Sequence, residues 1–288
     1  MTWRTPMIKV ASRTILVGLL ALGVAPLALA QLTASEQGPI VYGHHHLTVT
    51  NVEEHKHFWV DTLGGELLTR GNLQLIKFPN VLVFLREAEP ISGTKGTTVN
   101  HIGFAVPSTR ATVDRVRAAG YPIVTREELP PALSVEDGLA YIADQDTYIA
   151  FAMAPDGVKV ELLQNQEATP MTLHHIHFAG PVDDMKSWYV DTFNATPGNR
   201  GSFEAADLPG VNLTYSPSAV EPIGTRGAAL DHIGFEVDNL REFCEQLEAR
   251  GIIFDRPYTE IPSLNLGVAF LTDPFGTYIE LTEGLDKY

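Results

Sequence analysis

The chain repeats itself, and this repetition limits the folds open to it more than any other feature. FWVDTLGGE (58–66) resembles WYVDTFNAT (188–196), and GTKGTTVNHIGFAV (93–106) resembles GTRGAALDHIGFEV (224–237). Further matches follow in the same order, and the offset between these copies is about 130 residues. One domain has therefore been duplicated, which predicts a first domain at residues 39–167 and a second at 168–288.

Each half divides again into two similar units. HHHLTV (44–49) and NHIGFAV (100–106) are short alternating strands, and each is followed by a helix that a capping residue begins, Asn51 or Ser108. Three strand-like runs, separated by glycine, proline and asparagine, follow each helix. The second half repeats this order. The sequence therefore predicts an α+β fold of four tandem βαβββ units that form two domains.

The first thirty residues have a different character from the rest. Three basic residues precede an uncharged run from Thr14 to Ala30 that ends in Ala-Leu-Ala. This pattern is typical of a cleavable secretory signal peptide, and the run is short for a membrane span. We expect cleavage after Ala30, a linker at residues 31–38, and a secreted or periplasmic protein that makes no membrane contact after the signal peptide is removed.

The charge of the chain bears on its partners. The net charge is −15, and removal of residues 1–30 would leave −18, because that segment carries three cations and no anions. Such an acidic surface repels nucleic acid. The single cysteine, Cys244, allows no intramolecular disulfide. We expect a small-molecule substrate as the partner, and a monomer or a homodimer.

Histidines recur at a fixed spacing. His44 and His101 are 57 residues apart, as are His175 and His232, and each of the four begins the first strand of a unit. Each half then ends in a strand that carries a glutamate. The recurring set is His44, His101, Glu161, His175, His232 and Glu280.

The two-residue period of a strand predicts where these side chains point. Leu47 and Val49 belong in the core, so His44 and His46 point to the opposite face of the strand. His175 and His177 are placed in the same way in the second half. We expect these histidines and the glutamates to line the concave faces of the sheets.

Two imidazoles and one carboxylate that converge on a cavity are typical of a divalent metal site with open positions. This is the facial triad of non-haem Fe(II), which we favour, although zinc, manganese and nickel also accept these ligands. The alternative is a set of hydrogen-bonded polar residues on a wet sheet face. Recurrence of the whole set in both halves favours the metal site.

At these residues the chain resembles the vicinal oxygen chelate superfamily, which includes glyoxalase I, extradiol dioxygenases and bleomycin resistance proteins. LDHIGFEV, VAFLTDPFGTYIEL and HHIHFAG carry the resemblance, which covers residues 39–288. It implies a metal that chelates two neighbouring substrate oxygens. Carried over by position, it assigns two sites within the two halves: His44 with His101 and Glu161, and His175 with His232 and Glu280.

Departures from the known members keep the reaction open. Extradiol dioxygenases carry a tyrosine where this chain has Phe151 and Phe270. Glyoxalase I adds a fourth ligand, a glutamate, on a strand that here reads VLVFLRE or VNLTYSP, and only an inward Glu87 would supply it. The resemblance therefore favours a dioxygenase-like enzyme, with a glyoxalase-like isomerase or lyase as the alternative.

His46 and His177 lie two residues after a ligand on the same strand face. We expect each to act as a general base or to hold a substrate oxygen, and the alternative is that each only supports a ligand. Two non-enzymatic functions also stay open. One is a metal-free protein that binds a small molecule, as bleomycin resistance proteins do, and the other is a structural protein of the cell envelope.

Overall fold

The computed structural model describes residues 1, 32–33, 38–71 and 73–288. The expected signal peptide and most of the expected linker lie outside these residues. Within them, no helix is long and apolar enough to cross a membrane.

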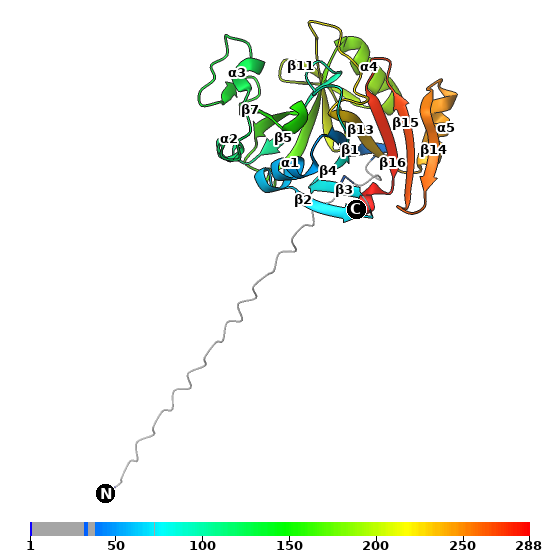
Figure 1. Ribbon diagram of the computed structural model, residues 1–288, viewed down its shortest axis with the longest axis horizontal. Helices are drawn as coiled ribbons and strands as arrows, with labels where there is room; N and C mark the ends of the chain where they lie inside the picture. The colour runs from blue at the N-terminus through cyan, green and yellow to red at the C-terminus, as the bar shows by residue number, and fades with distance from the viewer. Residues whose placement is uncertain (2–31, 34–37, 72) are drawn as a thin grey trace.

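The chain forms four consecutive βαβββ units, which confirms the predicted fold class (Figure 1). The first unit contains β1 (Ile40–Val49), α1 (Val52–Lys56), η2 (His57–Thr62), β2 (Glu66–Arg70), β3 (Leu73–Phe78) and β4 (Val81–Glu87). The second contains β5 (Val99–Val106), α2 (Thr109–Ala118), α3 (Thr125–Glu128), β6 (Ala140–Ile142), β7 (Thr147–Met153), η3 (Pro155–Gly157) and β8 (Lys159–Gln164). The third contains β9 (Thr172–Ala179), α4 (Val182–Phe193), β10 (Thr196–Arg200), β11 (Phe203–Leu208) and β12 (Val211–Ser216). The fourth contains β13 (Leu230–Val237), α5 (Leu240–Ala249), β14 (Phe254–Ile261), β15 (Leu266–Thr272), β16 (Tyr278–Glu283) and η4 (Leu285–Lys287).

Side-chain caps begin the first two helices where the sequence predicts them. The Asn51 side chain accepts hydrogen bonds from the backbone N–H groups of Glu53 and Glu54, and Ser108 Oγ accepts one from Ala111 N. These acceptors satisfy N–H groups that have no partner within the helix. Each cap therefore fixes the point at which the chain leaves the first strand of its unit.

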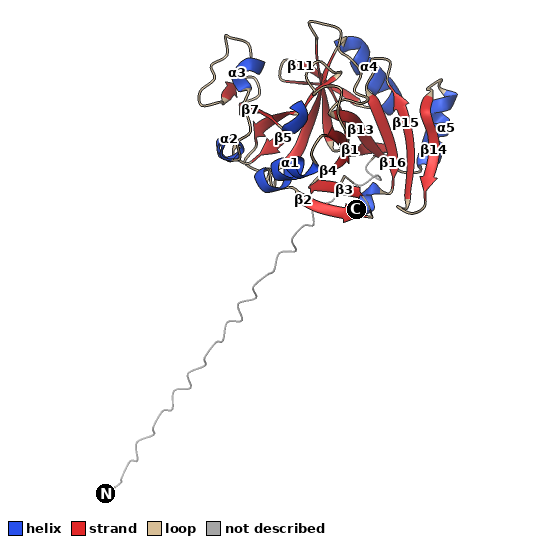
Figure 2. Ribbon diagram, viewed as in Figure 1, coloured by secondary structure: helices blue, strands red, loops and turns tan. Residues whose placement is uncertain are grey.

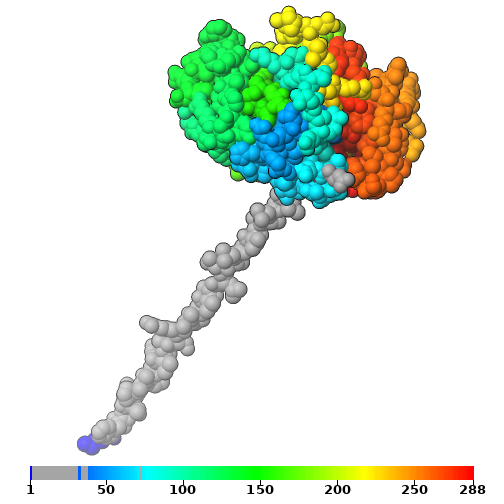
Figure 3. Space-filling view, in the orientation of Figure 1, coloured from blue at the N-terminus to red at the C-terminus, as the bar shows by residue number. Residues whose placement is uncertain are grey.

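The units pair across the two halves of the chain. The first sheet has the order β14-β15-β16-β13-β1-β4-β3-β2, so it joins the fourth unit to the first. The second sheet has the order β10-β11-β12-β9-β5-β8-β7-β6, so it joins the third unit to the second. Figure 3 shows the first unit, in blue and cyan, between the green second unit and the orange fourth unit. The duplicated halves at 39–167 and 168–288 therefore do not each form a sheet of their own.

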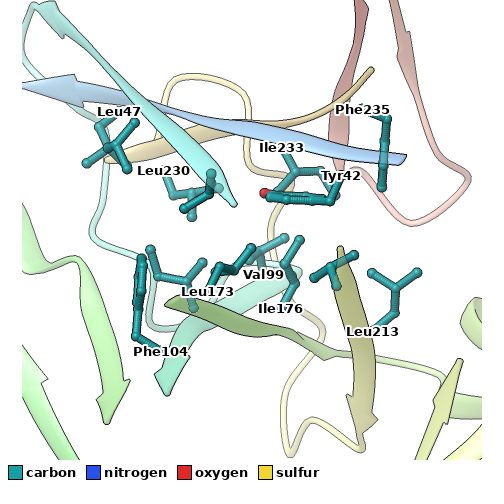
Figure 4. Close-up of a cluster of buried hydrophobic side chains, with 14 of the residues drawn as sticks. Tyr42, Leu47, Val99, Phe104, Leu173, Ile176, Leu213, Leu230, Ile233 and Phe235 are labelled. Atoms are coloured by element: carbon teal, nitrogen blue, oxygen red, sulfur yellow. The ribbon is translucent and has the colours of Figure 1, made fainter. Parts of the chain in front are cut away.

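The two sheets pack against each other through their apolar faces. Figure 4 shows one side of this core, Tyr42, Leu47, Leu230, Ile233 and Phe235, facing the other side, Val99, Phe104, Leu173, Ile176 and Leu213. All ten side chains are buried. Because successive side chains of a strand point to opposite faces, the histidines at alternate positions turn away from this core.

Helices pack along the outside of the strands (Figure 2). On one flank the ring of Phe58 in η2 meets Tyr121, just after α2, at a centroid distance of 4.9 Å. On the other flank Arg250, at the end of α5, donates hydrogen bonds to the carbonyls of Asp191 and Thr192 in α4. Each flank thus ties the first sheet to the second.

Candidate metal centres

Strand pairing brings a histidine against a glycine at the middle of each sheet. His44 of β1 lies opposite Gly234 of β13, and His175 of β9 lies opposite Gly103 of β5. A Cβ atom on either glycine would lie 1.9 Å from Cε1 of the histidine that faces it. The glycine in the repeated His-Ile-Gly-Phe motif therefore makes room for an imidazole from the partner unit.

This pairing corrects the predicted grouping of the six candidate ligands. His44 joins His232 and Glu280, and His175 joins Glu161 and His101, with His177 as a fourth possible ligand beside them. The sequence reasoning exchanged His44 and His175, because it kept each site within one half of the chain. We call the two groups the first-sheet cluster (His44, His232 and Glu280) and the second-sheet cluster (His101, Glu161 and His175).

In the first-sheet cluster, both histidines converge on one carboxylate oxygen. His44 Nε2 and His232 Nε2 each lie 2.9 Å from Glu280 Oε2. Both imidazoles are buried. The neighbouring rings are aromatic: Phe84 is 5.3 Å from His44 and Phe270 is 5.6 Å from His232, measured between ring centroids.

The second-sheet cluster has the same form. His101 Nε2 lies 2.8 Å and His175 Nε2 lies 3.1 Å from Glu161 Oε2, and the two nitrogens are 3.4 Å apart. All three side chains are buried. Metal–ligand bonds of about 2.0–2.2 Å that meet at right angles place neighbouring ligand atoms about 3 Å apart. The donor set and the separations of both clusters therefore fit a divalent metal.

Outer hydrogen bonds turn one histidine of each cluster toward the ligand position. His232 Nδ1 lies 2.6 Å from Asp231 Oδ1, and His101 Nδ1 lies 2.9 Å from Asn100 Oδ1. An Nδ1–H group that donates to such an oxygen leaves the Nε2 lone pair for a metal. Asp231 and Asn100 directly precede the histidines in DHIGF and NHIGF, so the repeat itself carried this signal, which the sequence reasoning missed.

The protonation states of the clusters follow from burial and pairing. Burial lowers the pKa of His101 and His175, which favours the neutral imidazoles that bind metals. Burial alone would raise the pKa of Glu161, but the nearby His175 and His101 outweigh it and hold that pKa well below its usual value. The second-sheet cluster thus presents an ionised carboxylate between two neutral imidazoles.

In the first-sheet cluster, burial tends to lower the pKa of His232. Hydrogen bonds to Asp231 and Glu280 outweigh this effect, so the pKa is raised. At a given pH, His232 therefore carries a second ring proton in a larger fraction of molecules than His101 does. A metal that binds the first-sheet cluster has to displace that proton from His232.

The two histidines predicted to act beside the metal lie next to the clusters. His46 is 4.5 Å from His232, and His177 stacks on His101 at 4.4 Å, both measured between ring centroids. His177 Nε2 lies 3.0 Å from Ser216 Oγ, and its Nδ1 is buried without a partner among the described residues. Burial lowers the pKa of His46 to about 3 and that of His177 well below its usual value.

A cavity of about 960 Å³ opens on the second-sheet cluster. His101, Glu161 and His177 line it, together with apolar side chains that include Leu129 and Phe203. Its size is that of a small-molecule site.

The corresponding face of the first sheet carries an apolar cluster instead. Leu75, Leu82, Phe84, Leu266 and Val268 pack there with Leu32 and with Leu285 and Tyr288 from the end of the chain. Figure 1 shows the C-terminus next to β2 and β3 of this sheet. The two clusters therefore differ in what covers them.

An arginine that the sequence reasoning missed reaches the second-sheet cluster. Arg200 Nη2 lies 3.4 Å from His175 Nε2 and 3.9 Å from Glu161 Oε2. The repeat did not single out Arg200 as a site residue. Arg70, the equivalent residue of the first unit, is exposed and lies near Tyr288, so the two arginines share a position in the repeat and differ in their surroundings.

Comparisons with known proteins identify the family and the fold. The sequence profile of the Glyoxalase/Bleomycin resistance protein/Dioxygenase superfamily matches residues 41–162 and 138–281. A "Probable lactoylglutathione lyase" from Vibrio cholerae is 31% identical over 139 residues, which are 43% of this chain and 91% of that protein. A mutant of glyoxalase I from Zea mays has the same fold, with a TM-score of 0.68 at 17% identity, over 88% of this chain and 97% of that one. The chain therefore belongs to the Glyoxalase/Bleomycin resistance protein/Dioxygenase superfamily, in a tandem form with four βαβββ units.

Proposed function

We propose that this protein is a divalent-metal enzyme that acts on a small substrate with two adjacent oxygens, and that the second-sheet cluster is its active centre. The observation that carries the proposal is the convergence of His101 Nε2 and His175 Nε2 on Glu161 Oε2 beside a cavity of about 960 Å³. Members of the superfamily use divalent metals and act on small molecules, which supports this reading.

The hydrogen bonding of His175 also favours a metal. Its Nε2 faces the carboxylate Glu161 Oε2, which calls for an N–H group, and it also faces the N–H groups of Arg200, which call for a lone pair. One nitrogen cannot meet both demands at once. A metal ion held between Nε2 and Oε2 would satisfy these two atoms and would leave only the Arg200 N–H groups in need of another acceptor.

We propose an Fe(II) dioxygenase-like reaction first. A fourth, carboxylate ligand of the glyoxalase I kind would lie on the last strand of the unit that supplies His175 or His44. At that place β12 carries Thr214, opposite His177, and β4 carries Phe84, opposite His46. Neither is a fourth carboxylate ligand. Two histidines and one carboxylate with open positions are the ligand set of non-haem Fe(II) oxygenases.

The residues of the chain have definite roles in such a reaction. The bound metal would polarise both substrate oxygens and ease the loss of a hydroxyl proton. His177 lines the cavity, and burial keeps it neutral, so its Nδ1, which has no partner among the described residues, is free to accept a hydrogen bond from the substrate hydroxyl. The apolar side chains of Leu129 and Phe203 keep water away from the reacting atoms.

A glyoxalase-like isomerase or lyase is the second candidate. The name of the Vibrio cholerae relative, "Probable lactoylglutathione lyase", favours it. The missing fourth carboxylate counts against it, and so does export, which we also propose, because an exported enzyme would not meet a cytoplasmic thiol substrate. Zinc, manganese or nickel would then be the metal.

Elemental analysis and oxygen uptake test the proposal together. The protein is purified without oxygen, loaded with Fe(II), Mn(II), Zn(II) or Ni(II), and supplied with catechol-type diols and with hydroxycarbonyl compounds. We expect stoichiometric metal, and oxygen uptake with Fe(II) that the Glu161→Ala variant lacks. Isomerisation with the other metals would favour the second candidate. Retained ligand without metal or turnover would instead support a binding protein and contradict the proposal.

A further inference from the structure

Arg200, the last residue of β10, is fixed beside the second-sheet cluster. Its side chain is 9% exposed. Nε donates to Thr214 Oγ1 at 2.9 Å, and Nη1 donates to Gln145 Oε1 at 3.3 Å. These two bonds orient the guanidinium so that Nη2 points at His175 Nε2 and Glu161 Oε2.

The two atoms that Nη2 faces are atoms that a metal would bind: His175 Nε2 is within hydrogen-bond distance, and Glu161 Oε2, at 3.9 Å, is an ion-pair contact. The imidazole nitrogen has a single lone pair, so a metal bound to Nε2 would remove that acceptor, and the positive charge of the metal would weaken the attraction between Arg200 and Glu161. A buried charged donor without an acceptor is costly. An anionic oxygen that binds next to the metal would supply the acceptor, and its charge would be shared between the metal and Arg200.

The repeat contains a natural comparison. Arg70, 130 residues earlier, is the last residue of β2 and holds the same place in its unit. It is exposed, donates to the carbonyl of Thr69, and lies 5.8 Å from the ring of Tyr288. The other buried cation of the cavity, Lys159, is already paired with Glu128 at 2.6 Å. Asp144 also lines the cavity and attracts Arg200, but its carboxylate accepts a hydrogen bond from Ser202 N and forms no ion pair with Arg200 within 4.0 Å among the described residues. Arg200 is therefore the cation of this cavity that metal loading would leave in need of a direct anionic partner.

We propose that Arg200 makes the second-sheet cluster selective for substrates in which one of the two adjacent oxygens belongs to a carboxylate, as in 2-oxo and 2-hydroxy acids. This inference rests on the proposed metal-dependent function. It adds a substrate class to that function, and Arg200 becomes the residue that determines specificity. Neutral compounds with two adjacent oxygens are expected to bind more weakly.

Pyruvate and hydroxyacetone are matched probes for this proposal. Each has two adjacent oxygens and one methyl group, and pyruvate has a carboxylate where hydroxyacetone has a neutral hydroxymethyl group. The purified protein is loaded with Mn(II), and the relaxation of the methyl protons of each probe is followed by NMR as protein is added. Elemental analysis gives the metal content of each sample, and calorimetry gives pyruvate affinity independently of the metal.

We expect the wild type to bind pyruvate at least about tenfold more tightly than hydroxyacetone, since a hydrogen bond between charged groups contributes about 1.5–3 kcal/mol. Arg200→Gln should keep its metal and lose this preference, and Arg200→Lys should recover part of it. Arg70→Gln is the matched control, and it should behave as the wild type.

The outcomes separate this inference from the proposed function. An Arg200→Gln variant that keeps both its metal and its preference for pyruvate overturns the inference alone. A wild type without metal whose calorimetric binding of pyruvate depends on Arg200 supports the anion site and overturns the metal-dependent function. A wild type that binds neither metal nor pyruvate overturns both.

Discussion

On the first sheet the ring of Phe84 borders His44 of the cluster and the adjacent His46, whereas on the second sheet Thr214 takes the corresponding place and holds Arg200. The ligand atoms of the two clusters are arranged almost alike, with separations of 2.8–3.1 Å from each histidine to its glutamate. One cluster faces an apolar surface on which the end of the chain packs, and the other faces a cavity. The two copies thus share the candidate ligands and differ in their surroundings.

Removing the glutamate of each cluster should give the largest and most unequal effect. Glu161→Ala and Glu280→Ala should each weaken metal binding at their own cluster by more than about 100-fold, beyond the usual loss for an outer partner. Only Glu161→Ala should also abolish the binding of pyruvate. Elemental analysis measures metal binding, and probe relaxation measures pyruvate binding. An equal loss of pyruvate binding in both variants would contradict the proposal that only the second-sheet cluster binds the substrate.

Glu236 provides a test of how the end of the chain is held on the first sheet. It accepts hydrogen bonds from Thr282 Oγ1 and from the backbone of Gly284 and Leu285, and its repeat counterpart on the second sheet is Ala105. Burial nevertheless raises its pKa from 4.5 to about 7. The folded protein therefore binds this proton more tightly than the unfolded chain does, and the resulting stability is present below pH 4.5 and is lost as the pH rises through 7.

Glu236→Gln should remove this dependence. The difference in the free energy of unfolding, variant minus wild type, should rise by about 3 kcal/mol between pH 4 and pH 8. This size follows from the shift of the pKa of Glu236 from 4.5 to about 7. Urea denaturation at the two pH values measures it. A difference that stays constant with pH would show that Glu236 remains ionised in the folded protein.

Adding a methyl group at the glycine of each motif should disturb one cluster at a time. Gly103→Ala should displace His175 and Gly234→Ala should displace His44, since each Cβ would lie 1.9 Å from the imidazole. Overpacking of this kind costs about 1–3 kcal/mol of stability, and the metal at that cluster should be lost. Thermal denaturation and metal analysis report both effects.

Gly198→Ala is the control for these variants, because a Cβ there has no heavy atom of the described residues within 4 Å. If Gly103→Ala and Gly234→Ala keep all their metal, the two histidines are not required for metal binding.

Exchanging the outer partners should have the smallest effect. Asp231→Asn should weaken metal binding at the first-sheet cluster by about tenfold, and Asn100→Asp should strengthen it at the second by a similar factor. Competition with a chelator measures each affinity, with the other cluster disabled by its glutamate-to-alanine change. Affinities that do not respond to either exchange would mean that Asp231 and Asn100 only pack against the histidines.

Local patterns predicted the units of this fold well. The alternating strands, the caps at Asn51 and Ser108, and the outward direction of the histidines each depend on a few neighbouring residues. The partner of each strand depends on contacts far apart in the sequence. His44 and His175 are equivalent in the repeat, so their spacing does not show which of them joins His101. The sequence reasoning grouped His44 with His101, whereas the structure places His175 there.

Arg200 escaped prediction for a related reason. Arg70 and Arg200 end equivalent strands, and only their surroundings decide where each side chain goes. Thr214 and Gln145 hold Arg200 over the second-sheet cluster, whereas Phe84, which replaces Thr214 on the first sheet, has no acceptor to offer Arg70. The pattern of residue types along the chain does not show which side chains from distant strands will contact each other.

The most direct test is a crystal structure of the metal-loaded protein with anomalous scattering measured at the absorption edge of the metal. We predict an anomalous peak bonded to His101 Nε2, His175 Nε2 and Glu161 in the wall of the cavity, with Arg200 beside it. A peak bonded to His44, His101 and Glu161, or a loaded protein without a peak at the second-sheet cluster, would contradict the account.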